Sequence, residues 1–189
     1  MNKLEEKLLS MASADKRGIE DLLSLFMPIS FRKGLIIGTP EHSYPILHFI
    51  ESGLLMGNYI VDDKEYPSWI SDHGFVLPIG GFLSKKNYSE FIMVLENSQC
   101  WYLNLAKAEI LAQKNYHLYR MLLEIFEENL QLTREREISL RIPNAYERYL
   151  KFMNEQSSRK YPLTNSVLAS LLSINEKHLS KLKRRYVKS

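Results

Sequence analysis

Residues 163–186 read LTNSVLASLLSINEKHLSKLKRRY, a stretch in which the spacing of apolar residues changes phase once. Leu168 and Leu172 are spaced for one face of a helix, and Leu179 and Leu182 are spaced for one face of another. The sequence therefore predicts two short helices that meet at a tight turn.

The predicted turn lies at Ser173, and Asn175 follows it as a good N-cap. We expect the side-chain oxygen of Asn175 to accept from the amide of Lys177 or His178. Ala169 has no side chain to obstruct the second helix where the two cross. Two short helices, a tight turn and a small residue on the packing face predict a helix-turn-helix. If the φ angle of Ser173 is positive, its strain costs about 1 kcal/mol.

The second helix is basic, which is typical of a DNA-recognition helix, although an amphipathic hairpin with solvated lysines has the same spacing. The charge distribution distinguishes the two interpretations. Residues 1–133 carry 12 Lys and Arg against 17 Asp and Glu, whereas residues 134–189 carry 13 against 5. The net charge of +3 therefore combines an acidic body with a basic tail, as expected when one end of the chain meets phosphate.

Contacts to DNA can be predicted along these helices. Lys177 and Lys181, four residues apart, are expected to reach base edges, and the basic residues nearer the C-terminus to touch phosphate. Glu176 is expected either to accept from cytosine or to favour the helix dipole. The candidate DNA-binding residues are Thr164, Asn165, Glu176, Lys177, His178, Ser180, Lys181, Lys183, Arg184 and Arg185.

Composition limits the other classes of function. The 189 residues are 45% hydrophobic and 25% charged, and no run approaches the roughly 20 apolar residues of a membrane span. Met1–Leu9 is too charged for a signal peptide, so we expect a cytoplasmic protein without a membrane partner. The single cysteine, Cys100, excludes an internal disulfide and is expected to be a buried structural thiol. The histidines lack metal-ligand spacing and no catalytic motif occurs, so no metal, cofactor or enzymatic activity is expected.

The rest of the chain predicts an α+β fold. Residues 2–14 and 17–26 have helical spacing, and glycines then punctuate short β-rich runs within 35–103. Frequent turns between short strands favour a β-sandwich or roll, with a hairpin turn at Asp62-Asp63. The run 116–142 lacks Pro and Gly and predicts a helix of about 25 residues.

This long helix carries two apolar stripes. We expect one stripe to face a partner helix in a homodimer, with a polar residue that fixes the register. The alternative is a single long helix that packs only on its own domain. The predicted dimer residues are Leu118, Leu122, Ile125, Asn129 and Leu132; Met121, Phe126 and Leu130 form the second stripe.

The order of these elements resembles the bacterial cyclic-AMP receptor protein and fumarate–nitrate regulator (Crp/Fnr) superfamily. The segments 31–37, 46–53, 72–76 and 147–149 look like its opening strand, its glycine-containing strand pair, the approach to its ligand site and the start of its DNA-binding domain. The resemblance implies a β-roll sensor domain similar to cyclic-nucleotide-binding jelly rolls (1–115), a dimerisation helix (116–142) and a winged helix-turn-helix (143–189). It also implies double-stranded DNA, a second copy and RNA polymerase as partners, and a small-molecule effector of unknown identity.

Departures from the family pattern change the expected ligand. Nucleotide-binding members have a glutamate and an arginine where this chain has Leu77-Pro78 and Ser89, so we expect no dependence on cyclic AMP. The degenerate pocket is expected to bind an apolar molecule or nothing. Its candidate residues are Phe75, Leu77, Phe82, Tyr88 and Ser89.

The predicted recognition helix also departs from the family. Lys177 and Lys181 replace a glutamate and an arginine, so the DNA site is expected to differ from the family's usual one. Any wing after Tyr186 is expected to be missing or very short. The leading interpretation is a homodimeric transcription regulator. The alternative is a ligand-sensing or protein-docking module that has lost DNA binding.

Overall fold

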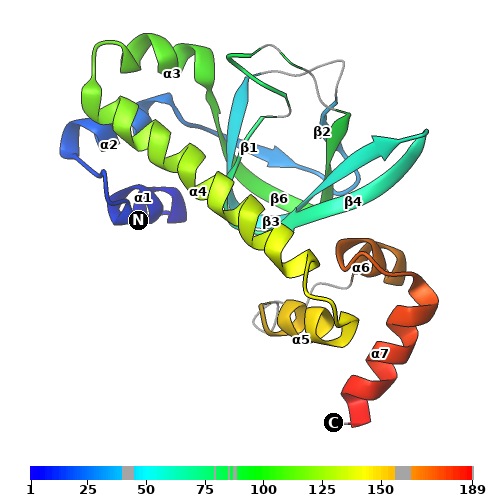
Figure 1. Ribbon diagram of the computed structural model, residues 1–189. Coiled ribbons are helices and arrows are strands. Elements are labelled where there is room, and N and C mark those ends of the chain that lie inside the picture. Colours follow the sequence, from blue (N-terminus) through cyan, green and yellow to red (C-terminus); the bar gives the residue numbers. More distant parts are fainter. Residues whose placement is uncertain (40–44, 79, 85, 87–88, 156–162, 189) are drawn as a thin grey trace.

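The computed structural model describes residues 1–39, 45–78, 80–84, 86, 89–155 and 163–188. A curved antiparallel sheet follows two short helices, and a third short helix and a long one then link the sheet to three further helices (Figure 1). In chain order the elements are α1 (Lys3–Ser10), α2 (Lys16–Leu25), β1 (Met27–Phe31), β2 (Ile36–Gly38), β3 (Ile46–Val61), β4 (Lys64–Ser71), β5 (Gly74–Val76), β6 (Glu90–Asn104), α3 (Leu105–Ala112), α4 (Tyr116–Leu140), α5 (Ala145–Glu155), α6 (Asn165–Leu171) and α7 (Glu176–Lys188).

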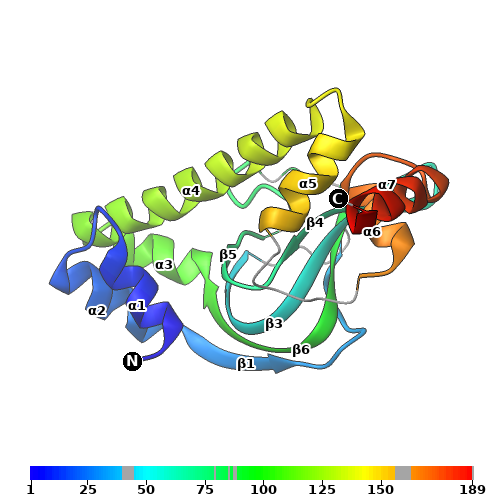
Figure 2. The ribbon, with the colours of Figure 1, turned by 90° about the horizontal axis from the view of Figure 1, so that it is seen from below.

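Two long strands, β3 and β6, carry the sheet. The strand order is β1-β6-β3-β4, while β2 pairs with β6 and β5 pairs with β3. Both long strands bend through the roll (Figure 2), so the runs predicted as separate short strands are parts of continuous ones. Gly53 lies at a bulge rather than a turn: its φ is +110°, and a Cβ there would lie 2.1 Å from Ser98 Oγ. The predicted hairpin turn is confirmed, with φ angles of 49° at Asp62 and 58° at Asp63.

Three hydrophobic cores support this arrangement. The helix-side core joins α1–α4 to the sheet and contains Leu4, Leu8, Met11, Leu22, Phe26, Leu47, Phe49, Phe75, Leu103, Leu105, Ala108, Leu118, Met121 and Ile125. The roll core contains Phe31, Ile50, Leu55, Val76, Ile92, Val94 and Cys100. The C-terminal core contains Tyr149, Leu168, Ala169, Leu172, Leu179 and Leu182.

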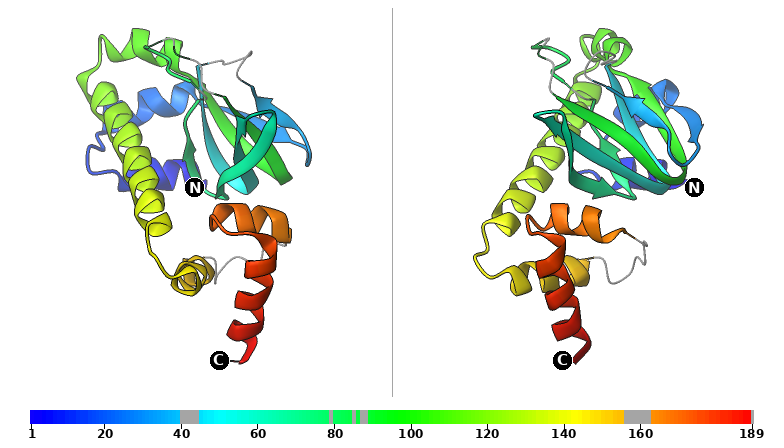
Figure 3. Two further views of the ribbon diagram at one scale, coloured as in Figure 1. Left: turned by 45° about the vertical axis from the view of Figure 1, so that its right-hand side comes forward. Right: turned by 90° about the vertical axis from the view of Figure 1, so that its right-hand side faces the viewer.

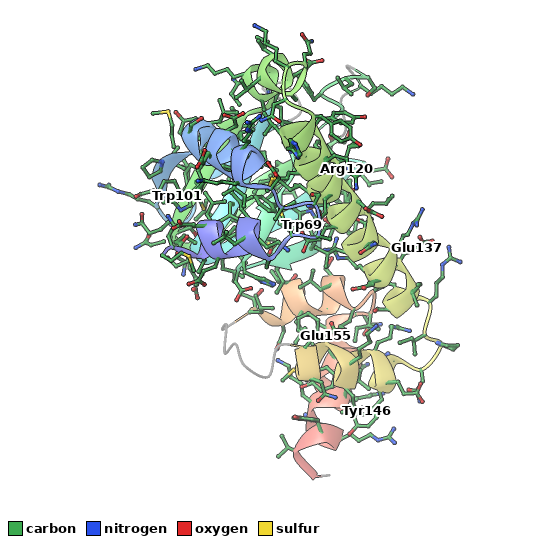
Figure 4. All side chains as sticks on the ribbon, turned by 90° about the vertical axis from the view of Figure 1, so that its left-hand side faces the viewer. Trp69, Trp101, Arg120, Glu137, Tyr146 and Glu155 are labelled. Atoms are coloured by element: carbon green, nitrogen blue, oxygen red, sulfur yellow. The ribbon has the colours of Figure 1, made fainter. Side chains whose placement is uncertain are left out.

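Helix α4 is fixed against its own domain. Leu118, Met121 and Ile125 are 0% exposed, so this face of the helix contributes fully to the helix-side core. Glu124 accepts hydrogen bonds from the amides of Ala12 and Ser13 at 2.8 and 2.7 Å, which holds the turn between α1 and α2. These contacts leave the opposite face of α4 pointing away from the domain (Figure 4).

The two-helix prediction for the C-terminus is confirmed. Ser173 has a φ of +54°, and the amide of Ile174 donates to the carbonyl of Ala169 at 3.0 Å, so the chain reverses between α6 and α7. Asn175 accepts from the amide of His178 at 2.8 Å, which is the N-cap expected for α7. The unit formed by α5–α7, residues 145–188, is called the C-terminal helical unit below.

Two buried side chains have shifted acidities. Cys100 is 2% exposed, and burial raises the pKa of its thiol to about 12, which confirms a structural role. His48 is 8% exposed, its ring lies 5.7 Å from that of Phe31, and its Nδ1 has no hydrogen-bond partner in the described part of the chain. Burial lowers the pKa of His48 from 6.5 to about 4. None of the described helices is long and apolar enough to cross a membrane.

We expect His48 to lower the free energy of unfolding as the pH falls. Between pH 6.5 and 4 the unfolded chain binds a proton at His48 that the folded chain does not. The free energy of unfolding should therefore be about 2 kcal/mol lower at pH 5 than at pH 7.5 from this group. In urea unfolding, His48→Leu should lose that part of the difference, whereas the exposed control His73→Ala should keep it. An unchanged pH dependence in His48→Leu would contradict the assignment.

We expect Ser173→Gly to stabilise the protein. Glycine adopts a φ of +54° without a steric penalty, so the free energy of unfolding should rise by about 1 kcal/mol. The matched control Ser180→Gly places glycine inside α7, where the change should lower stability by roughly 0.5–1 kcal/mol. Urea titrations compare both variants with the parent chain, and a loss of stability in Ser173→Gly would argue against strain at the turn.

Candidate nucleic-acid interface

The helix-turn-helix is held by a small core and two caps. The side chain of Thr164 accepts from the amide of Val167 at 3.3 Å, which starts α6. Leu168 and Ala169 face inward with 6% and 3% exposure, so α7 can cross close to α6 as the small residue predicts. The C-terminal core therefore fixes α7 relative to α6 without using its outer face.

The outer face of α7 carries three exposed cations. Lys177, Lys181 and Arg184 follow a spacing of four and three residues, which places them along one side of the helix. Leu179 and Leu182 lie on the inward side with 0% and 6% exposure. The three cations form no hydrogen bond or ion pair with the described part of the chain, and α7 projects away from the sheet (Figure 3). This basic face is free to meet a polyanion.

Two of the predicted phosphate contacts are engaged within the unit. Lys183 Nζ donates to Asn165 Oδ1 at 2.6 Å, so these two residues join α7 to the start of α6. The guanidinium of Arg185 lies 4.1 Å from the ring centroid of Tyr146 on α5, labelled in Figure 4. Both cations therefore help to hold the three helices together, a role that the charge pattern did not predict.

The remaining predicted residues lie at the start of α7. Glu176 and His178 are exposed in the first turn, where they accompany Lys177. Ser180 is half-buried, and its Oγ donates to the carbonyl of Glu176 at 3.0 Å. The acceptor and the dipole interpretations of Glu176 both fit this position.

Sequence reasoning missed the part played by Arg148. Its Nη1 donates to the carbonyl of Ile142 at 2.6 Å, and its Nε donates to the carbonyl of Leu172 at 3.2 Å. Lys151 Nζ adds a bond of 2.6 Å to Ser139 Oγ on α4. These bonds fix the helix-turn-helix to the end of α4. The resemblance at residues 147–149 marked this place in the sequence but not the bonds.

The stripe predicted for dimerisation needs correction. Leu118 and Ile125 are fully buried in the helix-side core, and Leu122 packs against that core, so they face the chain's own domain. Asn129 is half-buried, and its Nδ2 donates to the carbonyl of Ile125 at 3.0 Å. Leu132 is 51% exposed but lies on the same side of the helix as Ile125.

The exposed apolar stripe of α4 runs along the other side. Tyr119, Leu123, Phe126 and Leu130 are 48%, 49%, 39% and 51% exposed, and their spacing of four, three and four is that of a helix–helix seam. Phe126 and Leu130 belong to the second predicted stripe, whose third member, Met121, is instead fully buried in the helix-side core. The error has a physical reason: two apolar stripes on one helix do not reveal which one the domain covers.

Three of the predicted ligand residues lie together in or against the helix-side core. Phe75 belongs to the helix-side core, with ring centroids of Phe49 and Phe26 at 5.0 and 6.3 Å, and Leu77 and Phe82 pack against the same core. Ser89 is exposed, and its carbonyl accepts from the amide of Ile60 at 2.8 Å. Tyr88 lies outside the described residues. The apolar side chains named for the pocket thus include core residues.

A polar cluster that sequence reasoning missed lies beside Ser89. Trp69 on β4 donates its indole N–H to Glu90 Oε1 on β6 at 2.7 Å. Burial raises the pKa of Glu90, while that hydrogen bond and the charge of Arg136 on α4 act in the opposite direction. Burial also lowers the pKa of Arg136, opposed by Tyr59 and Glu90. The residues come from three distant parts of the chain, so no local pattern could reveal them.

In the described ranges no three His, Cys, Asp or Glu side chains gather as a metal site. No protein-family model and no curated protein sequence matches the chain.

Solved structures do match it. FixK2 from Bradyrhizobium japonicum is 13% identical, with a TM-score of 0.73 over 86% of this chain and 85% of that one. A CooA mutant from Carboxydothermus hydrogenoformans is 17% identical, with a TM-score of 0.67 over 100% and 85%. A chain from Eubacterium rectale described as a transcriptional regulator of the Crp/Fnr family is 13% identical, with a TM-score of 0.70 over 91% and 83%. This chain therefore has the fold of the Crp/Fnr regulators, which confirms the resemblance seen in its sequence.

Proposed function

We propose that the chain is a transcription regulator that binds a two-fold-symmetric DNA site as a homodimer. The observation that carries this proposal is the basic outer face of α7, where Lys177, Lys181 and Arg184 are exposed on the second helix of a helix-turn-helix. Positive charge on such a helix fits the phosphate backbone and the base edges of the major groove.

The three cations have different expected roles. Lys177 lies in the first turn of α7 and Lys181 one turn later, which is the part of a recognition helix that enters the major groove. Lysine donates to O6 and N7 of guanine, although without the planar fork of arginine. Arg184 lies further along the same face and is assigned to phosphate.

A homodimer supplies the second recognition helix that a two-fold site requires. The exposed stripe Tyr119, Leu123, Phe126 and Leu130 has the spacing of a seam between two α4 helices. Such a seam would leave α1 and α2 on the far side of α4, where Glu128 pairs with Lys7 at 2.6 Å. The two C-terminal helical units would then lie at the same end of the paired helices.

The structural neighbours support a regulatory role. FixK2 and CooA share the fold, and the Eubacterium rectale chain is described as a transcriptional regulator. Contact with RNA polymerase and control by a small-molecule effector are parts of the proposal that rest on this resemblance alone. Cyclic AMP is excluded from the proposed effectors because the glutamate and arginine that would bind it are replaced.

The proposal can be tested by selecting bound sequences from random duplex DNA, with and without cell extract. Enrichment of a palindromic site supports a dimeric DNA-binding protein, and enrichment only with extract indicates an effector. Absence of salt-dependent DNA binding in both arms would instead favour a ligand-sensing or docking module without DNA binding.

We expect the cations of α7 to affect DNA affinity in two ways. Lys177→Ala and Lys181→Ala should each weaken the best site by about 1–3 kcal/mol and random DNA much less, because they remove base contacts. Arg184→Ala should weaken all sequences alike and lower the salt slope by roughly one unit. Lys107→Ala, an exposed lysine on α3, is the control. Fluorescence anisotropy across a salt series measures these affinities. If Lys181→Ala lost as much affinity for random DNA as for the best site, Lys181 would not contact base edges.

We expect the exposed stripe of α4 to hold the dimer. Leu123→Glu combined with Phe126→Glu should give a folded monomer, because both side chains are exposed in the single chain. The control Leu132→Glu changes an equally exposed leucine about 150° round the helix from the stripe, and should leave the dimer intact. Light scattering at micromolar concentration gives the mass of each. The interface would be refuted if the parent chain were a monomer, or if Leu132→Glu gave a monomer while the double variant remained a dimer.

A further inference from the structure

Helix α6 is attached to the free edge of the sheet. Strand β4 ends the strand order, so among the described residues one of its edges has no strand beside it. Ser170 Oγ of α6 donates to the carbonyl of Pro67 on β4 at 2.9 Å, across 103 residues of sequence. Figures 1 and 3 show α6 between the sheet and the rest of the C-terminal helical unit. A helix that covers an edge strand gives its unpaired backbone groups a partner.

The face of α6 that meets β4 is separate from the face that meets α7. Leu168 and Ala169 are buried in the C-terminal core, whereas Val167 and Ser170 lie three residues apart and are half-buried outside that core. Helix α6 therefore packs on two sides at once. Its attachment to β4 is an addition to the covalent connection through α4 and α5.

Strand β4 is also tied to β6 at a residue whose charge is influenced by α4. Trp69, two residues after Pro67, donates to Glu90 on β6, and Arg136 on α4 lies near enough to stabilise the charge of Glu90. Gly57 on β3 makes room for the indole, because a Cβ there would lie 2.0 Å from Trp69 Nε1. Strand β4 thus contacts the helix-turn-helix through the hydrogen bond from Ser170 to Pro67 and contacts β6 through the hydrogen bond from Trp69 to Glu90, whose charge Arg136 of α4 stabilises. We call these two hydrogen bonds together with Arg136 the β4 bracket (Pro67–Ser170 and Trp69–Glu90–Arg136).

We propose that the β4 bracket holds the C-terminal helical unit in the orientation in which it binds DNA. This inference rests on the proposed function. A dimer that binds both halves of a two-fold site needs its two recognition helices about 34 Å apart, one turn of DNA. A unit that rotates freely at the end of α4 loses affinity when it is ordered on DNA. In the bracketed arrangement the basic face of α7 stays exposed, so the bracket orients α7 without covering it.

The test compares a duplex that carries both half-sites with one that carries a single half-site. Ser170→Leu removes the donor and adds bulk at the α6–β4 contact, and Glu90→Ala removes the acceptor of Trp69 and the partner of Arg136. Each should weaken binding to the two-half-site duplex by about tenfold and to the single half-site by less than twofold, because the loss is one of positioning. Ser170→Thr keeps the hydroxyl donor and should bind both duplexes like the parent chain.

A second measurement reports the contact itself without DNA. Hydrogen exchange of the peptides 64–71 and 165–171 should be faster in Ser170→Leu than in the parent chain and unchanged in Ser170→Thr. Faster exchange in Ser170→Leu with no loss of affinity for the two-half-site duplex would overturn the proposed role of the β4 bracket. A gain in that affinity would overturn it too, because the bracketed state would then be the inactive one. Equal losses on both duplexes would show damage to α7 rather than to positioning and would overturn it as well. If the parent chain binds neither duplex, the proposed function fails and the bracket fails with it.

Discussion

The burial of one face of α4 in the helix-side core determines how the remaining parts of the molecule are placed. Leu118, Met121 and Ile125 have no exposure, and Glu124 ties the turn between α1 and α2 to the same helix. Because a helix is rigid over 25 residues, this packing at one end sets the direction of every side chain at the other. It turns the apolar stripe outward, turns Arg136 toward the sheet and positions the C-terminal helical unit.

Features specified by a few neighbouring residues could be predicted from the sequence. The helix-turn-helix depends on a phase break, a cap at Asn175 and a small residue at Ala169, and each has a local physical cause. The hairpin turn at Asp62-Asp63 is local in the same sense. The continuity of β3 and β6 was missed because Gly53 permits either a turn or a bulge. Only the close approach of Ser98, 45 residues away, selects the bulge.

Features that depend on which surface is covered could not be predicted. The apolar residues of α4 have similar spacing on both sides, and which of them are covered is decided by α1, α2, α3 and the sheet, far away in the chain. In α7 the charge pattern does not show which cations are engaged within the protein, although Lys183 bonds Asn165 and Arg185 stacks on Tyr146. The cations that point outward are those that lie on the side of α7 opposite Leu179 and Leu182. This distinction follows from the helix period once the buried face is known.

The polar cluster beside Ser89 lies where the resemblance places the phosphate-binding arginine of nucleotide-binding proteins. In the nucleotide-binding proteins that this chain resembles, an arginine at the position of Ser89 neutralises a phosphate, whereas here the neighbouring residue is Glu90, a partly buried carboxylate. An anionic ligand placed there would face negative charge in a medium that screens it poorly. Positive charge near Glu90 comes from Arg136 on α4, and Trp69 donates a hydrogen bond to Glu90. Glu90 thus links the edge of the sheet, through Trp69, to the charge of Arg136 on α4.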